Sequence, residues 1–169
     1  MADPFGAGEG NLFKQVLGLH AAGRRAGGRH TLSEEGDMSL FKTVRPNIVQ
    51  SIRAFRVPDL AAEAERLGQH FLYANCAHAQ TKAEVLEVIA TNFLFPKHFG
   101  KNFDALHDCL TDLVHRAGPQ PGFVVVLEGL PTVQKFDKDA RETLLDVFRE
   151  AAEFWAERRV SFRVFYSFA

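Results

Sequence analysis

From residue 71 onward, short apolar runs alternate with longer segments that carry apolar residues every three or four positions. The first pattern predicts β-strands and the second predicts amphipathic helices. In chain order the predicted elements are a strand at 71–76, helices at 81–93 and 102–115, a strand at 123–127, a helix at 139–158 and a strand at 160–168. The almost continuous apolar character of 123–127 is typical of a central strand in a parallel sheet. Because strands and helices alternate, the sequence predicts an α/β fold: a small three-stranded parallel sheet with helices packed on it.

Residues 38–68 are too apolar for a free tail and predict an additional strand–helix unit. We expect a strand at 51–57, followed by a short helix that Pro58 opens, since proline is tolerated in a first helical turn. Gly68 is placed to end that helix. Its apolar face would consist of Leu60, Ala64 and Leu67. We therefore expect residues 38–68 to form an extension that packs on the main domain, residues 69–169.

Residues 1–37 have a different composition, since they hold eight of the thirteen glycines. Such a composition is typical of a disordered tail. Arg24, Arg25 and Arg29 form a small basic cluster in it, and contact with RNA is the alternative interpretation of that cluster. The whole chain, however, has a formal net charge of −1 with 24% charged residues, which gives no general footprint for nucleic acid or for a membrane surface.

Length and cysteine content favour a cytoplasmic protein with one hydrophobic core. With 169 residues, 46% of them hydrophobic, the chain can bury one substantial core. No apolar run approaches the ~18 residues of a membrane span, and the first residues lack the pattern of a signal peptide. The two cysteines, Cys76 and Cys109, are expected to be buried reduced thiols.

The most informative candidate site is the predicted helix 102–115. Asn102 is suited to cap its first turn, and two acidic residues, Asp104 and Asp108, follow four positions apart on the flank that also carries Thr111. The opposite, buried stripe would consist of Phe103, Leu106, Leu110 and Leu113. Two neighbouring carboxylates destabilise their own helix slightly, which suggests that they meet a cation from elsewhere. The alternative is an ordinary solvated helix face.

The loop before this helix places a histidine, an aromatic ring and a glycine, His98, Phe99 and Gly100, beside the carboxylates. They would form a recognition edge, or the two rings would serve only for packing. We expect no metal site, because no pair of histidines or cysteines has a convincing ligand spacing. A phosphodiesterase site built from His98, His107 and Asp108 is a weaker alternative, since no positioned nucleophile or oxyanion donor accompanies them. No glycine-rich phosphate loop is present, and we expect no cofactor.

Three stretches resemble the barstar family of intracellular ribonuclease inhibitors. They read FPKHFGKNFDALHDCLTDL at 95–113, VVVLEG at 124–129 and LLDVFREA at 144–151, and the resemblance extends over residues 69–169. The positions that match the family's central segment are Pro96, Gly100, Asn102, Asp104, Ala105, Leu106, Asp108, Cys109, Leu110 and Thr111.

The resemblance implies a small α/β domain whose second helix and preceding loop block the active site of a barnase-type ribonuclease. It implies that Asp108 enters the enzyme's phosphate-binding centre and that Asp104 and Glu150 pair with basic residues of the enzyme. The full set of expected partner-binding residues is His98, Phe99, Gly100, Asn102, Asp104, His107, Asp108, Thr111 and Glu150. The protein would then be a cytoplasmic antitoxin rather than an enzyme. Its partner would be a basic extracellular-type ribonuclease or a related nuclease toxin, with no direct contact to nucleic acid or membrane.

Four positions depart from the family pattern. His98 and Phe99 replace two tyrosines, His107 replaces a tryptophan, and Lys101 replaces a glutamate. Aromatic anchors carry much of the energy of protein interfaces, so these changes predict weaker binding to a strongly basic ribonuclease. Either the target is a different basic nuclease than barnase, or the barstar-like module has been redirected to another toxin or regulatory partner.

Overall fold

The computed structural model describes residues 39–113 and 121–169 of the chain. The predictions made for the tail 1–37, for Met38 and for the last two residues of the predicted helix 102–115 lie outside these residues.

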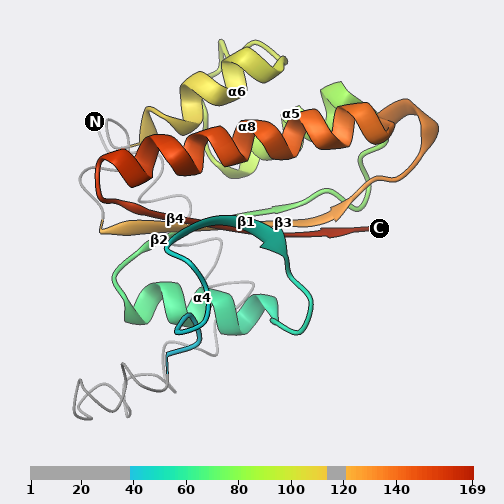
Figure 1. Ribbon diagram of the computed structural model, residues 1–169. Helices are drawn as coiled ribbons and strands as arrows, with labels where there is room; N and C mark the ends of the chain where they lie inside the picture. The colour runs from blue at the N-terminus through green and yellow to red at the C-terminus, as the bar shows by residue number, and fades with distance from the viewer. Residues whose placement is uncertain (1–38, 114–120) are drawn as a thin grey trace.

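The core of the fold is a parallel sheet of four strands in the order β1-β4-β3-β2 (Figure 1). In chain order the strands are β1 (Asn47–Ser51), β2 (His70–Asn75), β3 (Gly122–Leu130) and β4 (Ser161–Phe168). The predicted α/β fold with a parallel sheet is confirmed, and the sheet has one strand more than the predicted three. The apolar run at 123–127 lies, as predicted, in a central strand, with Val125 paired to Leu72 on one side and to Val164 on the other.

The fourth strand comes from the extension, but not from the predicted residues. We predicted a strand at 51–57, whereas β1 is Asn47–Ser51 and pairs in parallel with β4, for example Val49 with Val164. Residues after Ser51 turn away, because Arg53 adopts a left-handed backbone with a φ of 47°, a conformation that cannot continue a strand. A turn closes there, with Phe55 N donating to Ile52 O at 2.9 Å.

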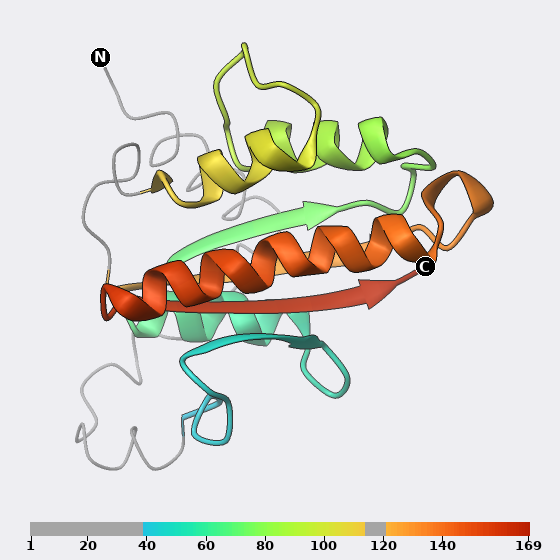
Figure 2. The same ribbon diagram turned by 45° about the horizontal axis from the view of Figure 1, so that its top comes forward.

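Helices cover both faces of the sheet. On one face lie α5 (Lys82–Asn92), α6 (Phe103–Leu110) and α8 (Lys138–Glu157), whereas α4 (Val57–Arg66) lies on the other (Figures 1 and 2). A short 3-10 helix, η1 (Gln134–Phe136), precedes α8. The buried cluster on the three-helix face includes Leu72, Ile89, Leu106, Val125, Phe148, Trp155 and Phe162.

Local sequence signals explain where these helices begin and end. Thr81 caps α5 in a reciprocal box with Glu84, and Asp137 caps α8 by accepting from Ala140 N at 2.9 Å. Gly68 follows α4 with a φ of 70°, the left-handed geometry that favours glycine at a helix end. The predicted helix 102–115 ends earlier than expected, at Leu110. Its stop coincides with Thr111, whose hydroxyl donates back to His107 O at 2.9 Å and so competes with continued helix geometry.

Residues from the extension and from the sheet share a second buried cluster. Its members are Phe41, Val44, Leu60, Ala64, Phe71, Val124, Val126 and Phe165. Phe41 stacks on Phe165 with ring centroids 5.8 Å apart, and it also lies 4.5 Å from the Arg163 guanidinium. Arg163 is buried here, and its Nε donates to Arg45 O at 3.1 Å. The sheet face opposite α8 is therefore covered by residues that precede residue 69.

Glu63 on α4 is a buried carboxylate that links Ser39 and Arg66 by hydrogen bonds. It accepts from Ser39 Oγ at 2.7 Å and from Arg66 at 2.7 and 2.9 Å, and only 8% of it is exposed. Burial alone would raise the pKa of Glu63, but the hydrogen bonds from Arg66 and Ser39 and the charge of Arg66 bring the pKa below its ordinary value.

We expect Glu63→Gln to lower the free energy of unfolding at pH 7 by about 1–3 kcal/mol, because charge-assisted hydrogen bonds are lost. A carboxylate whose pKa is lowered on folding stabilises the protein above its ordinary pKa, and this contribution is lost as the pH falls through the folded-state value. The difference between wild type and Glu63→Gln should therefore shrink below about pH 4. Urea unfolding at pH 7 and pH 3.5 measures it. As a control, Glu142→Gln, at an exposed position of α8, should show no such pH-dependent difference, and an equal difference for Glu63→Gln at both pH values would contradict the prediction.

Candidate functional site

The carboxylates of α6 are exposed because the other side of this helix is buried. Asn102 caps the first turn, its Oδ1 accepting from Ala105 N at 2.8 Å. The predicted stripe is buried at Leu106, Leu110 and Leu113 and half-buried at Phe103. With that stripe toward the core, Asp104 and Asp108 are both exposed. Asn102 thus has a structural role in positioning the acidic pair.

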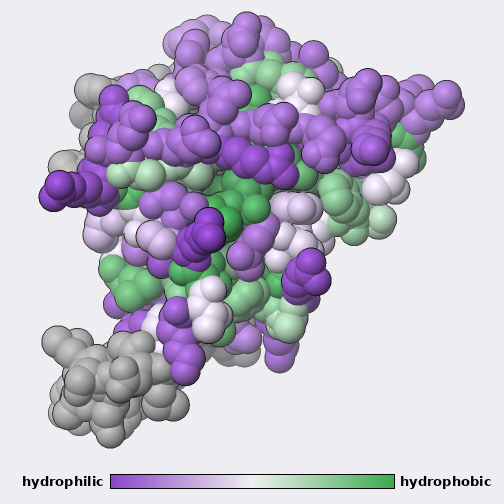
Figure 3. All heavy atoms as spheres, viewed as in Figure 1, coloured by the Kyte–Doolittle hydropathy of each residue, from purple (hydrophilic) through white to green (hydrophobic). Residues whose placement is uncertain are grey.

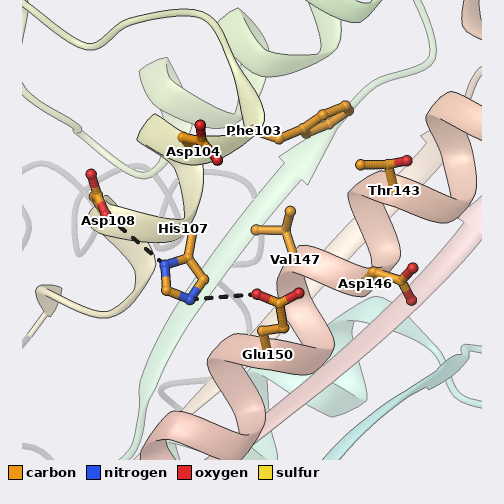
Figure 4. A pocket seen from close by; sticks show the side chains of 8 residues that line it. All are labelled: Phe103, Asp104, His107, Asp108, Thr143, Asp146, Val147 and Glu150. Atoms are coloured by element: carbon orange, nitrogen blue, oxygen red, sulfur yellow. Dashed lines mark ion pairs between the residues drawn. The ribbon is translucent and has the colours of Figure 1, made fainter.

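Helix α8 brings a second pair of carboxylates to α6. Trp155, buried in α8, donates from Nε1 to Leu110 O at 3.0 Å and so fastens the end of α6 to α8. Five and nine positions earlier on α8, Glu150 and Asp146 are exposed. All four of these acidic residues line the gap between α6 and α8. In Figure 4 the Glu150 side chain points toward His107 of α6, whereas the Asp146 side chain points away from α6.

The result is an open cleft of about 430 Å³ with carboxylates on both walls (Figure 4). Its lining residues are Phe103, Asp104, His107 and Asp108 from α6, and Thr143, Asp146, Val147 and Glu150 from α8. The structure therefore brings together four of the predicted residues, Asp104, His107, Asp108 and Glu150, although Glu150 is far away in sequence.

Two polar lining residues, Thr143 and Asp146, were missed in the sequence. A signal for them exists, because they precede Glu150 by seven and four positions and so share its helix face. The signal alone was insufficient, since it does not say which neighbouring helix that face meets.

His107 lies between the two acidic walls. Its Nε2 is 3.7 Å from Glu150 Oε1 and its Nδ1 is 3.9 Å from Asp108 Oδ1. Both distances are longer than those of hydrogen bonds. The contacts are ion pairs only when the imidazole is protonated, since the neutral ring carries no charge. Asp146 has a closer partner, since Arg149 Nη1 lies 2.6 Å from its Oδ1.

The loop before α6 does not line this cleft in the described structure. His98 and Gly100 are exposed, whereas Phe99 is half-buried, with its ring centroid 5.5 Å from that of Phe95. The packing interpretation therefore describes Phe99 in the free protein. Lys101 turns toward α5, and its Nζ lies 3.4 Å from Glu87 Oε2.

Thr111 and the two cysteines are poorly placed for catalytic chemistry in this structure. The Thr111 hydroxyl is engaged by the backbone of its own helix. Neither cysteine forms a disulfide; Cys76 is buried as predicted, whereas Cys109 is only half-buried, which corrects our expectation. Burial raises the pKa of the Cys76 thiol to about 12, so it is not a thiolate nucleophile at neutral pH.

Within residues 39–113 and 121–169, no three His, Cys, Asp or Glu side chains are grouped so that they could hold a metal ion. No helix in this described part of the chain is both long and apolar enough to traverse a bilayer. The carboxylates that line the cleft make a positively charged group its natural complement.

Comparison with curated protein sequences gives no match to this chain. A family model described as "Barstar (barnase inhibitor)" matches residues 69–167, which is more than half of the chain and includes both helices of the cleft. The resemblance seen in the sequence is therefore confirmed, and the chain belongs to the barstar family.

Proposed function

We propose that this protein inhibits a basic ribonuclease by inserting the acidic cleft between α6 and α8 into the enzyme's active site. The observation that carries the proposal is the convergence of Asp104, Asp108 and Glu150 on one exposed cleft, in a chain of the barstar family. The partner would be an extracellular-type ribonuclease or a related nuclease toxin. The inhibitor would act in the cytoplasm, without a cofactor.

Electrostatics supports this role. A ribonuclease site presents Arg, Lys and His to a polyanion, so a protein that blocks it needs fixed carboxylates at phosphate-like positions. The side chains of Asp108 and Glu150 are 86% and 65% exposed, and both stand on helices whose other sides are buried. Each charge-assisted hydrogen bond to a cation of the enzyme contributes about 1.5–3 kcal/mol.

The surface around the cleft also favours a contact led by charge. Hydrophilic side chains dominate the surface over α6 and α8 (Figure 3). Complementary fields accelerate association, an effect for which barnase and barstar are themselves the standard example. A binding role fits these features better than the phosphodiesterase alternative, because His107 has carboxylates on both sides but no positioned nucleophile in the described cleft.

The departures from the family pattern bear on the choice of enzyme. The charge of Lys101 is partly offset by Glu87, so its effect on the acidic surface is smaller than the sequence suggested. His107 has the larger effect, because a titratable ring stands where the family pattern has a tryptophan. We infer a nuclease with requirements different from those of barnase, with a redirected partner as the alternative.

The test is an inhibition titration with full-length protein, using several basic ribonucleases, barnase included, on a fluorogenic RNA substrate. We expect at least one enzyme to be inhibited with 1:1 stoichiometry. The apparent affinity should fall by about tenfold or more between 0.05 and 0.5 M NaCl, because the Debye length that screens exposed charges shortens from about 14 Å to about 4 Å over this range. Folded protein that inhibits none of the enzymes would contradict the proposal and favour the redirected module. An affinity insensitive to salt would contradict the acidic cleft as the contact.

A further inference from the structure

One basic side chain sits inside the surface that the proposed function assigns to a basic partner. Among the eight described residues that line the cleft, His107 alone can carry a positive charge. Its two nitrogens face carboxylates of different helices, Asp108 on α6 and Glu150 on α8, at 3.9 and 3.7 Å (Figure 4). The side chain is 38% exposed, so solvent reaches the ring and protons can exchange.

The other charged groups that the structure describes near the cleft are four carboxylates and three cations. The carboxylates that line the cleft with His107 are Asp104 and Asp108 from α6, and Asp146 and Glu150 from α8. The cations of the surrounding elements contact groups other than Asp108 and Glu150. Arg149 pairs with Asp146, Lys101 of the loop pairs with Glu87, and Lys82 of α5 lies 4.8 Å from the centroid of the Phe103 ring.

We propose that His107 is an internal competitor of the partner's cations, so that protonation of its imidazole weakens inhibition. This inference rests on the proposed function. The protonated ring pairs with Asp108 and Glu150, so these two carboxylates are no longer available to the partner's cations. It also adds a positive charge to the cleft, which repels those cations. The neutral ring has no such pairs. Histidine is the side chain that ordinarily changes charge between pH 5 and 8, so the protein binds best at neutral to alkaline pH and releases its partner on acidification.

The binding test compares wild type with His107→Gln. Kd is measured by calorimetry at pH 5.5 and 7.5, at constant ionic strength, against the ribonuclease that the inhibition titration identifies. The wild-type Kd should rise on acidification by about three- to tenfold more than that of His107→Gln, the size of one or two exposed ion pairs. Titrations of the nuclease itself affect both proteins alike. His78→Gln, at an exposed position between β2 and α5, should behave as wild type, and equal ratios for wild type and His107→Gln would overturn the inference.

A second measurement needs no partner, so that failure of the proposed function and failure of this inference remain distinguishable. In the free full-length protein, the NMR side-chain carboxyl resonances of Asp108 and Glu150 are followed from pH 5 to 8, together with the His107 ring. Both carboxyl resonances should show an inflection that coincides with titration of the ring and disappears in His107→Gln. The carboxyl of Glu153, which lies on the part of α8 that faces β1, serves as the control. Carboxyl resonances that ignore the titration of His107 would overturn the inference even if a ribonuclease is inhibited.

Discussion

Asp108→Ala is expected to weaken ribonuclease binding by about 100-fold or more, with little change in thermal stability. The Asp108 carboxylate is 86% exposed and lies 3.9 Å from the imidazole of His107. In the proposed complex it accepts at least two charge-assisted hydrogen bonds, for example from one guanidinium group, and its removal leaves that cation unpaired in the interface. In the free protein the substitution relieves the repulsion from Asp104, so the free energy of unfolding should change by no more than about 0.5 kcal/mol.

The control for this prediction is Glu153→Ala. Like Asp108→Ala, it removes one exposed negative charge. Glu153, however, lies in a groove on the β1 side of α8, beside Asn47, Ile48 and Val49, and not in the acidic cleft. Its Kd should stay within about twofold of wild type, since an exposed charge outside the interface contributes little. Calorimetric titration and a thermal melt of each variant decide the matter. If both variants weakened binding equally, the effect would come from net charge. If Asp108→Ala lowered the melting temperature by many degrees, Asp108 would be needed for stability and not specifically for binding.

The acidic pair on α6 was predictable because every determinant is local. The Asn102 cap, the buried stripe and the four-residue spacing of Asp104 and Asp108 all lie within a single short segment. The complete cleft could not be predicted from the sequence, because it depends on how α6 packs against α8. That contact is fixed by burial of Leu106 and Leu110 and by the bond from Trp155 to Leu110 O, across 45 positions of sequence.

In the extension, too, the element with local sequence signals was predictable, whereas the element that depends on a tertiary contact was not. The helix α4 was predictable from Pro58, its apolar face and Gly68, and the structure places it at Val57–Arg66. The strand was assigned to the wrong residues, because β1 has polar side chains at Asn47, Gln50 and Ser51 and so lacks a strong strand pattern. Its strand conformation comes from pairing with β4, and a tertiary contact of this kind leaves no periodic signal in the sequence.

The largest effect on stability is expected from Leu60→Ala. Leu60 is fully buried in the cluster that α4 forms with Val124, Val126 and Phe165 of the sheet. Truncating a buried leucine removes its transfer free energy and leaves a cavity, which lowers the free energy of unfolding by about 2–5 kcal/mol. Val133→Ala, at an apolar side chain that is 44% exposed, is the matched control and should cost no more than about 0.5 kcal/mol. Urea unfolding followed by circular dichroism measures both.

This prediction also separates the stability of the fold from the proposed function. Helix α4 lies on one face of the sheet, and α6 and α8, which line the acidic cleft, lie on the other (Figure 1). Where Leu60→Ala is still folded, its ribonuclease Kd should equal that of wild type, the reverse of the result expected for Asp108→Ala. The loss of stability should appear as one cooperative transition at a lower urea concentration, since Val124, Val126 and Phe165 belong to the two central strands that also support α8. A separate early transition with the main midpoint unchanged would instead mean that α4 and β1 can be removed without cost to the part of the chain that matches the barstar family.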